Sequence, residues 1–232
     1  MLTVTTPATE TALTTLDAVK ADIGITTTVD DDYINSKILQ VIDEIYDYLK
    51  VQRAQDGTRT IAQESLLEIF RPERNGRSRV GLLGMGVNSL TSVNRRQSLV
   101  LARWPVTAIA SVIEGTATLD PSQYEVTPSG ILTRLSNGYS VGWSHSIIQV
   151  AYTAGWIIAS DETRTLPYSI EAAAIDYIKE LRLNRRRDPR LKSLSVTGIS
   201  DKDFWVGAVG EEGSMPPNVT SRLDRYRRVS FG

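Results

Sequence analysis

Few residues in this sequence have the types and spacing that catalysis requires. The 232-residue chain has no cysteine and one histidine, so thiol nucleophiles, disulfides, iron–sulfur clusters and cysteine zinc sites are excluded. The segment Gly142–Ser146 (GWSHS) resembles a nucleophile elbow, but it ends in serine rather than glycine, and His145 directly follows Ser144. We interpret it as a polar surface loop and keep a hydrolase using Ser144 and His145 as a third hypothesis.

Glycine and carboxylate patterns do not complete a nucleotide or metal site either. Gly81, Gly84 and Gly86 follow the order G-x-x-G-x-G without a subsequent Lys-Ser/Thr, so neither phosphate-binding fingerprint is met. The triplet Asp30–Asp32 lacks the glycine and the distant glutamate of an EF-hand loop, and we predict that it caps a helix. We therefore expect no catalytic residue, no cofactor and no metal ion.

The overall composition is that of a soluble globular protein. Apolar residues make up 41% of the chain, and 26 basic residues are balanced by 27 acidic ones. No apolar run approaches the roughly 20 residues that cross a bilayer, and the first residues lack the basic start of a signal peptide. We expect a protein without a membrane segment.

Acidic and basic residues alternate along the chain in blocks. Residues 1–56 carry 10 acidic and 4 basic groups, whereas residues 57–113 carry 3 acidic and 8 basic groups. Residues 182–232 are basic again, with 11 basic and 6 acidic groups. A pI near 5.9 disfavours sequence-specific DNA binding, while blocks of opposite sign suit docking between unlike surfaces, including head-to-tail contacts around a ring.

Helical periodicity frames the chain. We predict a flexible arm over residues 1–12, a short helix between Thr15 and Gly24, and a second helix over residues 31–51. A long helix begins at Pro167, near residues 166–186, and a short helix follows Pro216-Pro217. These helices form the predicted α-helical core.

Between these helices, residues of about 60–155 change to a period of two with recurrent turn signals. The fold class is therefore α+β, an α-helical core with an inserted antiparallel β-meander, within one domain over residues 13–230. The expected strands are residues 65–71, 98–103, 106–113, 124–127, 131–135, 139–143 and 147–152.

Arginine-rich segments are the candidate contact surfaces. Residues 71–96 form a predicted long mobile loop, and residues 193–215 a glycine-containing extended loop. The end of the long helix carries five arginines, which are a solvated face, a contact for an acidic partner, or a phosphate contact. These five are Arg182, Arg185, Arg186, Arg187 and Arg190.

The C-terminal segment, residues 216–232, is amphipathic and basic. Val219, Leu223 and Tyr226 share one face, and we expect that this face needs a partner because the segment is too short to bury it. The opposite face is basic, with Arg222, Arg225 and Arg228.

The order of these elements, together with four short motifs, resembles the tailed-phage head-tail connector (adaptor) family, of the siphophage type. The resemblance covers about residues 13–50 and 97–228, and residues 51–96 depart from it by being longer and richer in arginine. The motifs are RWPVT at 103–107, YTAGW at 152–156, Leu166-Pro167, and RRRDP at 185–189.

The resemblance implies a structural virion protein without catalytic activity. It implies a homo-oligomeric ring, typically of twelve subunits, assembled beneath the portal vertex from protein made in the host cytoplasm. Its partners would be the portal protein, a stopper or tail-completion protein, and packaged DNA that passes through the lumen without sequence specificity.

Two sets of residues receive roles from the resemblance. Val219, Arg222, Leu223, Arg225, Tyr226 and Arg228 would dock on the portal, and Arg182, Arg185, Arg186, Arg187 and Arg190 would contact a subunit, the portal or DNA. The alternative function is a nucleic-acid-binding module that uses Arg71–Arg96 and Arg182–Arg190.

Overall fold

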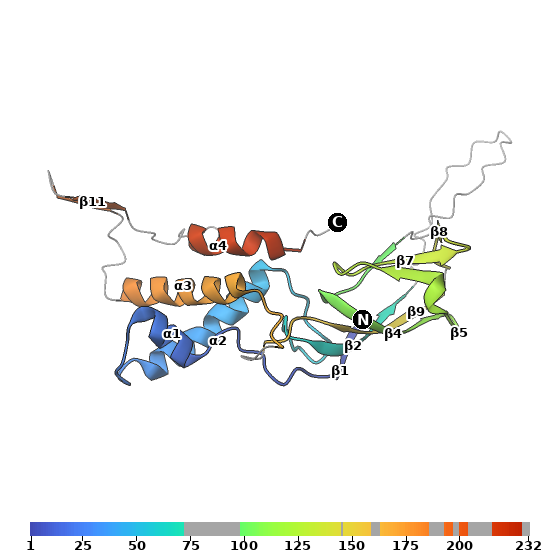
Figure 1. The fold of residues 1–232 in the computed structure, drawn as a ribbon, viewed down its shortest axis with the longest axis horizontal. Helices are drawn as coiled ribbons and strands as arrows, with labels where there is room; N and C mark the ends of the chain where they lie inside the picture. The colour runs from blue at the N-terminus through green and yellow to red at the C-terminus, as the bar shows by residue number, and fades with distance from the viewer. Residues whose placement is uncertain are drawn as a thin grey trace, which may run out of the picture. The chain divides into compact units, whose positions relative to one another are not determined.

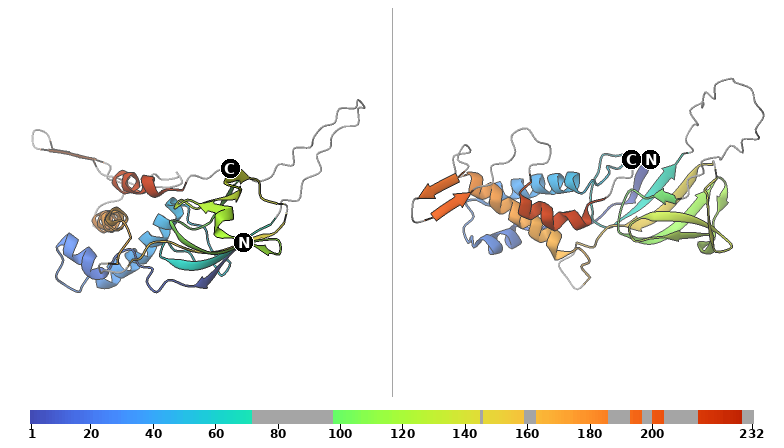
Figure 2. Two further views of the ribbon diagram at one scale, coloured as in Figure 1. Left: turned by 45° about the vertical axis from the view of Figure 1, so that its right-hand side comes forward. Right: turned by 90° about the horizontal axis from the view of Figure 1, so that it is seen from above.

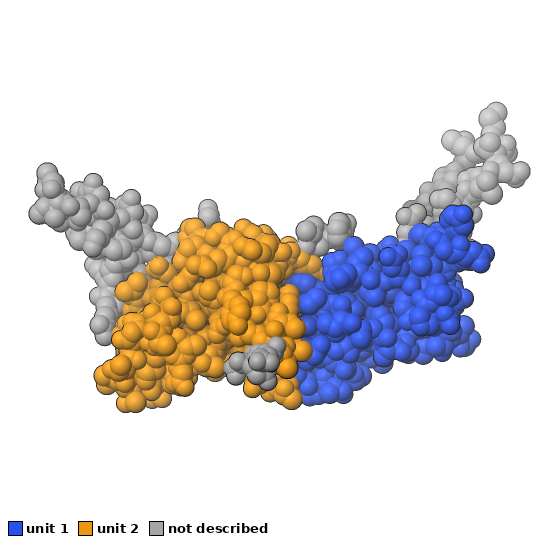
Figure 3. Space-filling model, viewed as in Figure 1, with its two compact units in different colours: residues 1–8, 52–58, 63–155 blue, residues 9–51, 59–62, 156–232 orange. Residues whose placement is uncertain are grey.

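The chain forms two compact units in a computed structural model. The model describes residues 1–71, 98–144, 146–158, 163–185, 193–196, 200–203 and 215–228. Unit 1 contains residues 1–8, 52–58 and 63–155, and unit 2 contains residues 9–51, 59–62 and 156–232 (Figure 3). The β-rich insertion that we predicted lies in unit 1, together with residues 1–8 and 52–58.

Unit 1 consists of two antiparallel sheets (Figure 1). The first has the order β1-β2-β9-β4-β5, and the second has the order β3-β7-β6 with β8 paired to β7. A 3-10 helix, η1 (Pro121–Gln123), precedes β6. The strands are β1 (Leu2–Thr6), β2 (Glu64–Phe70), β3 (Ser98–Val100), β4 (Val106–Glu114), β5 (Ala117–Thr118), β6 (Tyr124–Val126), β7 (Ile131–Ser136), β8 (Tyr139–Val141) and β9 (Ile148–Ala154).

The core of unit 1 lies on one face of the central strand β9. Every second residue of β9 is buried, namely Ile148, Val150, Tyr152 and Ala154. Leu99 and Leu132 of the second sheet belong to the same apolar cluster. The alternating pattern that predicted the β layer therefore marks the side of each strand that faces the core.

The N-terminal residues are not the free arm that we predicted. Leu2–Thr6 form β1, which pairs antiparallel with β2, and Leu2 is buried in the core. The segment is rich in threonine, which suits a strand, but five residues are too few for a pattern to emerge. The prediction of a flexible arm is wrong for residues 2–6.

Turn chemistry fixes the hairpin between β7 and β8. Asn137 and Gly138 both have positive φ, at 51° and 79°, as a tight hairpin turn requires. The pairs formed by β9 with β2 and with β4 join strands that are distant in sequence. Turn signals indicate only neighbouring pairs, so these long-range pairs were not predicted.

Unit 2 consists of four α-helices, a 3-10 helix and a hairpin among its described residues. In Figure 1, helix α3 lies between α1 and α2 on one side and α4 on the other, and α3 packs against all three helices. The elements are α1 (Leu16–Ile23), α2 (Asp31–Tyr48), α3 (Tyr168–Arg185), β10 (Ser193–Val196), β11 (Ser200–Asp203), α4 (Pro217–Leu223) and η2 (Asp224–Tyr226).

Helix α1 begins and ends where its sequence predicts. The Thr15 side chain accepts a hydrogen bond from the amide of Ala18, and Gly24 follows the helix with φ of 74°, in the left-handed region. Helix α2 differs, because Asp30 stands at its N-cap without a capping hydrogen bond from its side chain. Asp30 therefore lies at the predicted N-cap position, with Asp31 and Asp32 in the first turn as expected, but its carboxylate binds arginines of α3 instead of the helix amides.

The predicted α+β class, with a helical core and an inserted antiparallel layer, is confirmed. The strand expected over 98–103 ends at Val100, and the next residues, Leu101–Arg103, are buried. Most of the predicted loops at 71–96 and 193–215 lies outside the described residues. None of the described helices is long and apolar enough to span a bilayer.

Candidate assembly surfaces

The arginines at the end of α3 already have an acidic partner within unit 2. Arg182 binds Asp30 through Nη2 at 2.9 Å and Nε at 3.3 Å, and Nη1 of Arg185 lies 3.8 Å from the same carboxylate. The Arg185 guanidinium also lies over the Tyr33 ring, 4.5 Å from its centroid. These contacts join the start of α2 to the end of α3.

Of the three interpretations of this basic helix end, contact with an acidic group describes Arg182 and Arg185 best. The acidic group belongs to the same chain, so part of the pairing that we expected between subunits occurs within unit 2. Arg186, Arg187 and Arg190 lie outside the described residues.

The apolar face of the C-terminal segment is covered by the chain itself. Val219 and Leu223 are 0% exposed, and α4 packs against α3. The expectation that this face needs an external partner is therefore wrong, because α3 supplies a second apolar surface. The sequence could indicate this, since α3 has apolar residues on more than one of its faces.

Polar and aromatic contacts also hold this segment in place. The Tyr226 hydroxyl shares a hydrogen bond of 2.7 Å with the Ser169 hydroxyl, and its ring meets Trp156 edge-on at 6.3 Å. Arg222 Nη2 lies 3.2 Å from the Asp176 carboxylate of α3. Trp156, the last residue of the YTAGW motif, thus anchors the C-terminal segment.

The end of this segment is bound to the end of α2. The Tyr48 hydroxyl donates a hydrogen bond to Asp224, and the Arg227 guanidinium lies 5.2 Å from the centroid of the Tyr48 ring. Burial, together with the Asp224 carboxylate, raises the pKa of Tyr48. The amide of Arg228 also donates to the carbonyl of Leu49 at 3.4 Å.

These contacts leave a basic surface facing solvent. Arg222, Arg225 and Arg227 are exposed, while Tyr226 and Arg228 are partly buried. We call Arg222, Arg225 and Arg227 the basic face of the C-terminal segment. Arg222 and Arg225 belong to the predicted docking set, whereas Arg227 was not predicted, and a partner could reach all three while the helices stay packed.

In unit 1, the arginine of the RWPVT motif has a structural role that the sequence analysis missed. Arg103 is buried, donates a hydrogen bond to the carbonyl of Gln52, and places its Nε 3.8 Å from Glu64. Glu68, also buried, accepts hydrogen bonds from the Tyr152 hydroxyl at 2.9 Å and from the Ala102 amide at 2.8 Å.

The pKa values of this buried cluster follow from its environment. Burial raises the pKa of Glu64, although Arg103 opposes the shift. Burial and the neighbouring Glu68 carboxylate raise the pKa of Tyr152. One feature of the sequence could have indicated this buried cluster. Glu64, Leu66 and Glu68 occupy alternate positions of β2, so both glutamates lie on the same face of the strand as the buried leucine.

The described geometry around Ser144 does not form a nucleophile site. Its hydroxyl shares a hydrogen bond of 2.6 Å with the Ser146 hydroxyl, and its amide donates to Glu114 at 2.7 Å. Burial alone would raise the pKa of Glu114, but hydrogen bonds from Ser144 and Arg134 lower it. His145 lies outside the described residues, and among those described no cluster of His, Asp or Glu could hold a metal ion.

The family model described as "Phage gp6-like head-tail connector protein" matches residues 13–70. The match includes the helices α1 and α2 and the strand β2. We expected residues 51–96 to depart from the family, and the match contradicts this expectation for residues 51–70. No curated protein matches the sequence at a significant level.

Solved structures of gene transfer agent particles share the fold over the whole chain. A chain in the virion of a native gene transfer agent is 13% identical, with a TM-score of 0.52, over 100% of this chain and 98% of the other. Neck chains of the empty particle with C6 symmetry and of the native particle with C12 symmetry have the same coverage. Their identities are 13% and 14%, and their TM-scores are 0.51 and 0.50.

The two comparisons are consistent with each other. One rests on sequence and covers the N-terminal helices, and the other rests on the fold and covers both units. The resemblance of this chain to the head-tail connector family, predicted from its sequence, is therefore confirmed.

Proposed function

We propose that this chain is a head-tail connector, a structural virion protein that forms a ring at the junction between a DNA-filled capsid and a tail. The observation that carries the proposal is the end-to-end fold match with chains of gene transfer agent necks, in which both chains are covered almost completely. The connector family match over residues 13–70 supports the same role independently.

The proposed partners follow from this location. The ring would consist of about twelve copies, a number that the C12 symmetry of one similar neck supports. It would bind the portal protein on one side and a stopper or tail-completion protein on the other, and DNA would pass through its lumen without sequence specificity. The role requires no catalysis, cofactor or metal ion.

Within this ring, the C-terminal segment would dock on the portal as a folded element. Because Val219 and Leu223 are buried against the chain's own helices, the docking contacts would come from the basic face, Arg222, Arg225 and Arg227. An acidic portal surface fits this face, since arginine binds carboxylates through parallel hydrogen bonds. Arg186, Arg187 and Arg190 stay proposed contacts to a subunit, the portal or DNA.

The nucleic-acid-binding alternative has no support among the described residues. Arg182 and Arg185 bind Asp30, and most of Arg71–Arg96 lies outside the described part of the chain. We therefore retain one proposed function.

The test is the mass of the chain by light scattering, alone and then mixed with portal rings from the same virus. We expect one bound chain per portal subunit in the mixture. A chain that stays separate from portal rings at every concentration would refute the connector role, and salt-dependent binding to duplex DNA would then favour the alternative.

A further inference from the structure

Helix α3 has a second face that the chain leaves partly uncovered. Tyr168, Ala172, Ile175, Lys179 and Leu183 follow one another at spacings of four, three, four and four residues, which places them along one line of the helix. Tyr168 is 75% exposed and Leu183 is 62% exposed, while Ala172 and Ile175 are partly buried. We call these five residues the α3 outer face.

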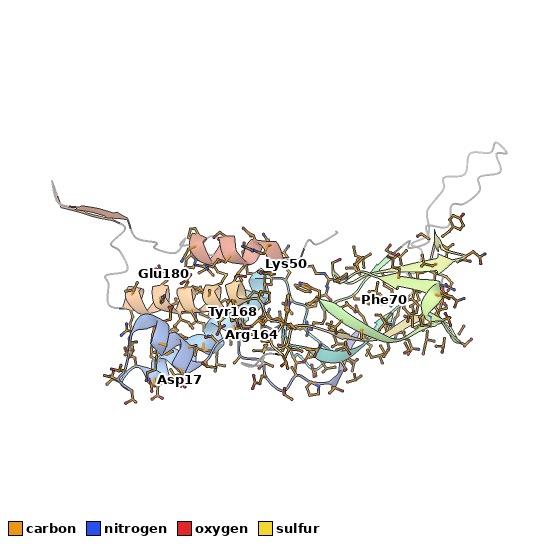
Figure 4. The ribbon with its side chains drawn as sticks, viewed as in Figure 1. Asp17, Lys50, Phe70, Arg164, Tyr168 and Glu180 are labelled. Carbon is orange, nitrogen blue, oxygen red and sulfur yellow. The ribbon has the colours of Figure 1, made fainter. Side chains whose placement is uncertain are left out.

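This face lies on the side of α3 away from the core. The buried residues of the helix, Ile170, Ala173, Ala174, Tyr177 and Ile178, fall on the other side at 100° per residue. The first residue of the outer face, Tyr168, is labelled in Figure 4, and the Arg164 guanidinium lies 4.7 Å from the centroid of its ring.

Helix α2 has an outer face of a different chemical character. Asp32, Ser36, Leu39, Asp43 and Asp47 recur at spacings of four, three, four and four residues, and all five are exposed. Leu39, at 72% exposure, is the apolar residue among them. We call this set the α2 outer face; Arg59 binds Asp43 and Asp47 but leaves both carboxylates at the surface.

Neither outer face lies on the buried side of its helix. Helices α2 and α3 pack side by side (Figure 2). Two separate faces of one packed unit cannot meet within a chain, but they can meet between successive copies. A contact between two unlike faces repeats from copy to copy and closes into a ring when the rotation allows it.

Helix length and exposed apolar residues favour a second copy as the occupant of the α3 outer face. Both helices have 18 residues, or about 27 Å, so one can lie along the whole length of the other. Lys179 binds Asp22 and lies 3.9 Å from Asp176 within its own chain, so its charge is already compensated. Leu39 on one face and Tyr168 and Leu183 on the other are exposed apolar side chains, which a contact between the two helices would bury.

We propose that the α3 outer face of one copy binds the α2 outer face of the next, and that this contact closes the connector ring. The inference rests on the proposed function and adds the subunit interface to it. Leu39 and Leu183 are then near neighbours across each subunit boundary.

The absence of cysteine from the chain allows a direct test by cross-linking. The variant carrying both Leu39→Cys and Leu183→Cys is assembled on portal rings and treated with a short bis-maleimide. We expect a ladder of covalent oligomers up to the size of the ring, with loss of the monomer band. Either single variant should stay monomeric, and a mixture of the two single variants should give dimers and nothing larger.

A matched pair controls for cross-linking by proximity in the ring. Tyr139→Cys combined with Leu39→Cys also places two exposed thiols on the chain, since Tyr139 of β8 is 77% exposed and belongs to neither outer face, and it should give no ladder. A ladder from this control, or dimers from the Leu39→Cys single variant, would overturn the interface.

The mass of the untreated complexes separates the two proposals. Variants that join portal rings but give no ladder overturn the interface and leave the connector role intact. If neither the parent chain nor the variants join portal rings, the connector role fails and the interface fails with it.

Discussion

The two units stabilise themselves in different ways. Unit 1 places charged groups inside, where Arg103, Glu64 and Glu68 are buried together. Unit 2 has an apolar interior, and the ion pairs that join its helices, such as those between Asp30, Arg182 and Arg185, keep contact with solvent. Arg103 is therefore an interior group of unit 1, whereas Arg182 and Arg185 form ion pairs near the surface of unit 2. Arg59 of unit 2 also has a covered side chain, but its partners Asp43 and Asp47 are exposed.

The difference matters because burial changes the energetics of a charge. A buried ion pair contributes little to net stability relative to apolar packing, but the loss of one partner leaves an uncompensated charge at a large cost. A surface pair is screened by water and salt, and its loss is mild. The RWPVT motif should thus be sensitive to substitution in folding experiments, and the RRRDP helix end much less so.

The largest effect is expected from Arg103→Met. The substitution keeps much of the side-chain volume but leaves the Glu64 carboxylate without its buried cation, so unit 1 should lose about 3–5 kcal/mol. Hydrogen exchange of the β9 amides measures this loss. The control Arg53→Met removes an exposed arginine of the same unit and should change stability by less than about 0.5 kcal/mol. Equal effects of the two variants would contradict the contrast between interior and surface arginines.

The interior of unit 2 should respond to the loss of volume rather than of charge. Leu223→Ala opens a cavity where α4 packs on α3, and we expect a loss of about 2–5 kcal/mol. Urea unfolding followed by circular dichroism of the helices measures it. A loss below about 0.5 kcal/mol would mean that the C-terminal segment detaches easily, which would restore the idea that its apolar face awaits a partner.

Acid titration distinguishes two carboxyls of unit 1. Burial raises the folded-state pKa of Glu64, so its contribution is favourable at acid pH, where the group is protonated, and is lost as pH rises through that pKa. Glu64→Gln mimics the protonated form of this side chain at every pH. The free energy of unfolding of the variant, relative to that of the parent chain, should therefore be greatest near neutral pH and should fall in acid, where Glu64 of the parent is itself protonated.

Glu114 should behave in the opposite sense. Hydrogen bonds hold its folded-state pKa below the ordinary value, so its stabilisation is present above the unfolded-state pKa and is lost as pH falls through the folded-state pKa. Glu114→Gln should thus cost most at neutral pH. Urea unfolding of both variants at several pH values checks the two signs, and parallel pH profiles would refute the difference.

The sequence predicted the structural features that are set by adjacent residues, such as helix ends and turns. Thr15 and Gly24 bound α1 as expected, and Asn137-Gly138 forms the β7–β8 turn, because caps and turns are set by a few adjacent residues. The partners of Asp30 and Arg103 were not predicted, since they are distant in sequence and depend on how helices and strands pack. For the same reason, amphipathicity identified the C-terminal helix but not the α3 surface that covers Val219.

A smaller effect is expected from Asp30→Asn. The variant removes the carboxylate that Arg182 and Arg185 share, but these groups are partly exposed, so screening limits the loss to about 1 kcal/mol at low salt. Thermal unfolding at low and high salt measures it, and the difference from the parent should shrink as salt is added. Asp32→Asn, an exposed neighbour, should fold like the parent. A loss of stability that is the same at low and high salt would mean that the Asp30 carboxylate behaves as a buried group.

The smallest effect on folding is expected from Arg225→Glu, and it separates folding from docking. Arg225 is exposed and its guanidinium lies 5.8 Å from the centroid of the Tyr226 ring, so reversal of its charge should change stability by no more than about 0.5 kcal/mol. Binding to portal rings should nevertheless weaken, and more at low salt than at high salt, because the reversed charge repels an acidic portal surface.

Asn218→Glu is the matched control. It adds a negative charge at an exposed position on the same segment outside the basic face, and it should bind portal rings more tightly than Arg225→Glu. Unchanged binding of Arg225→Glu would remove this arginine from the docking surface without affecting the fold.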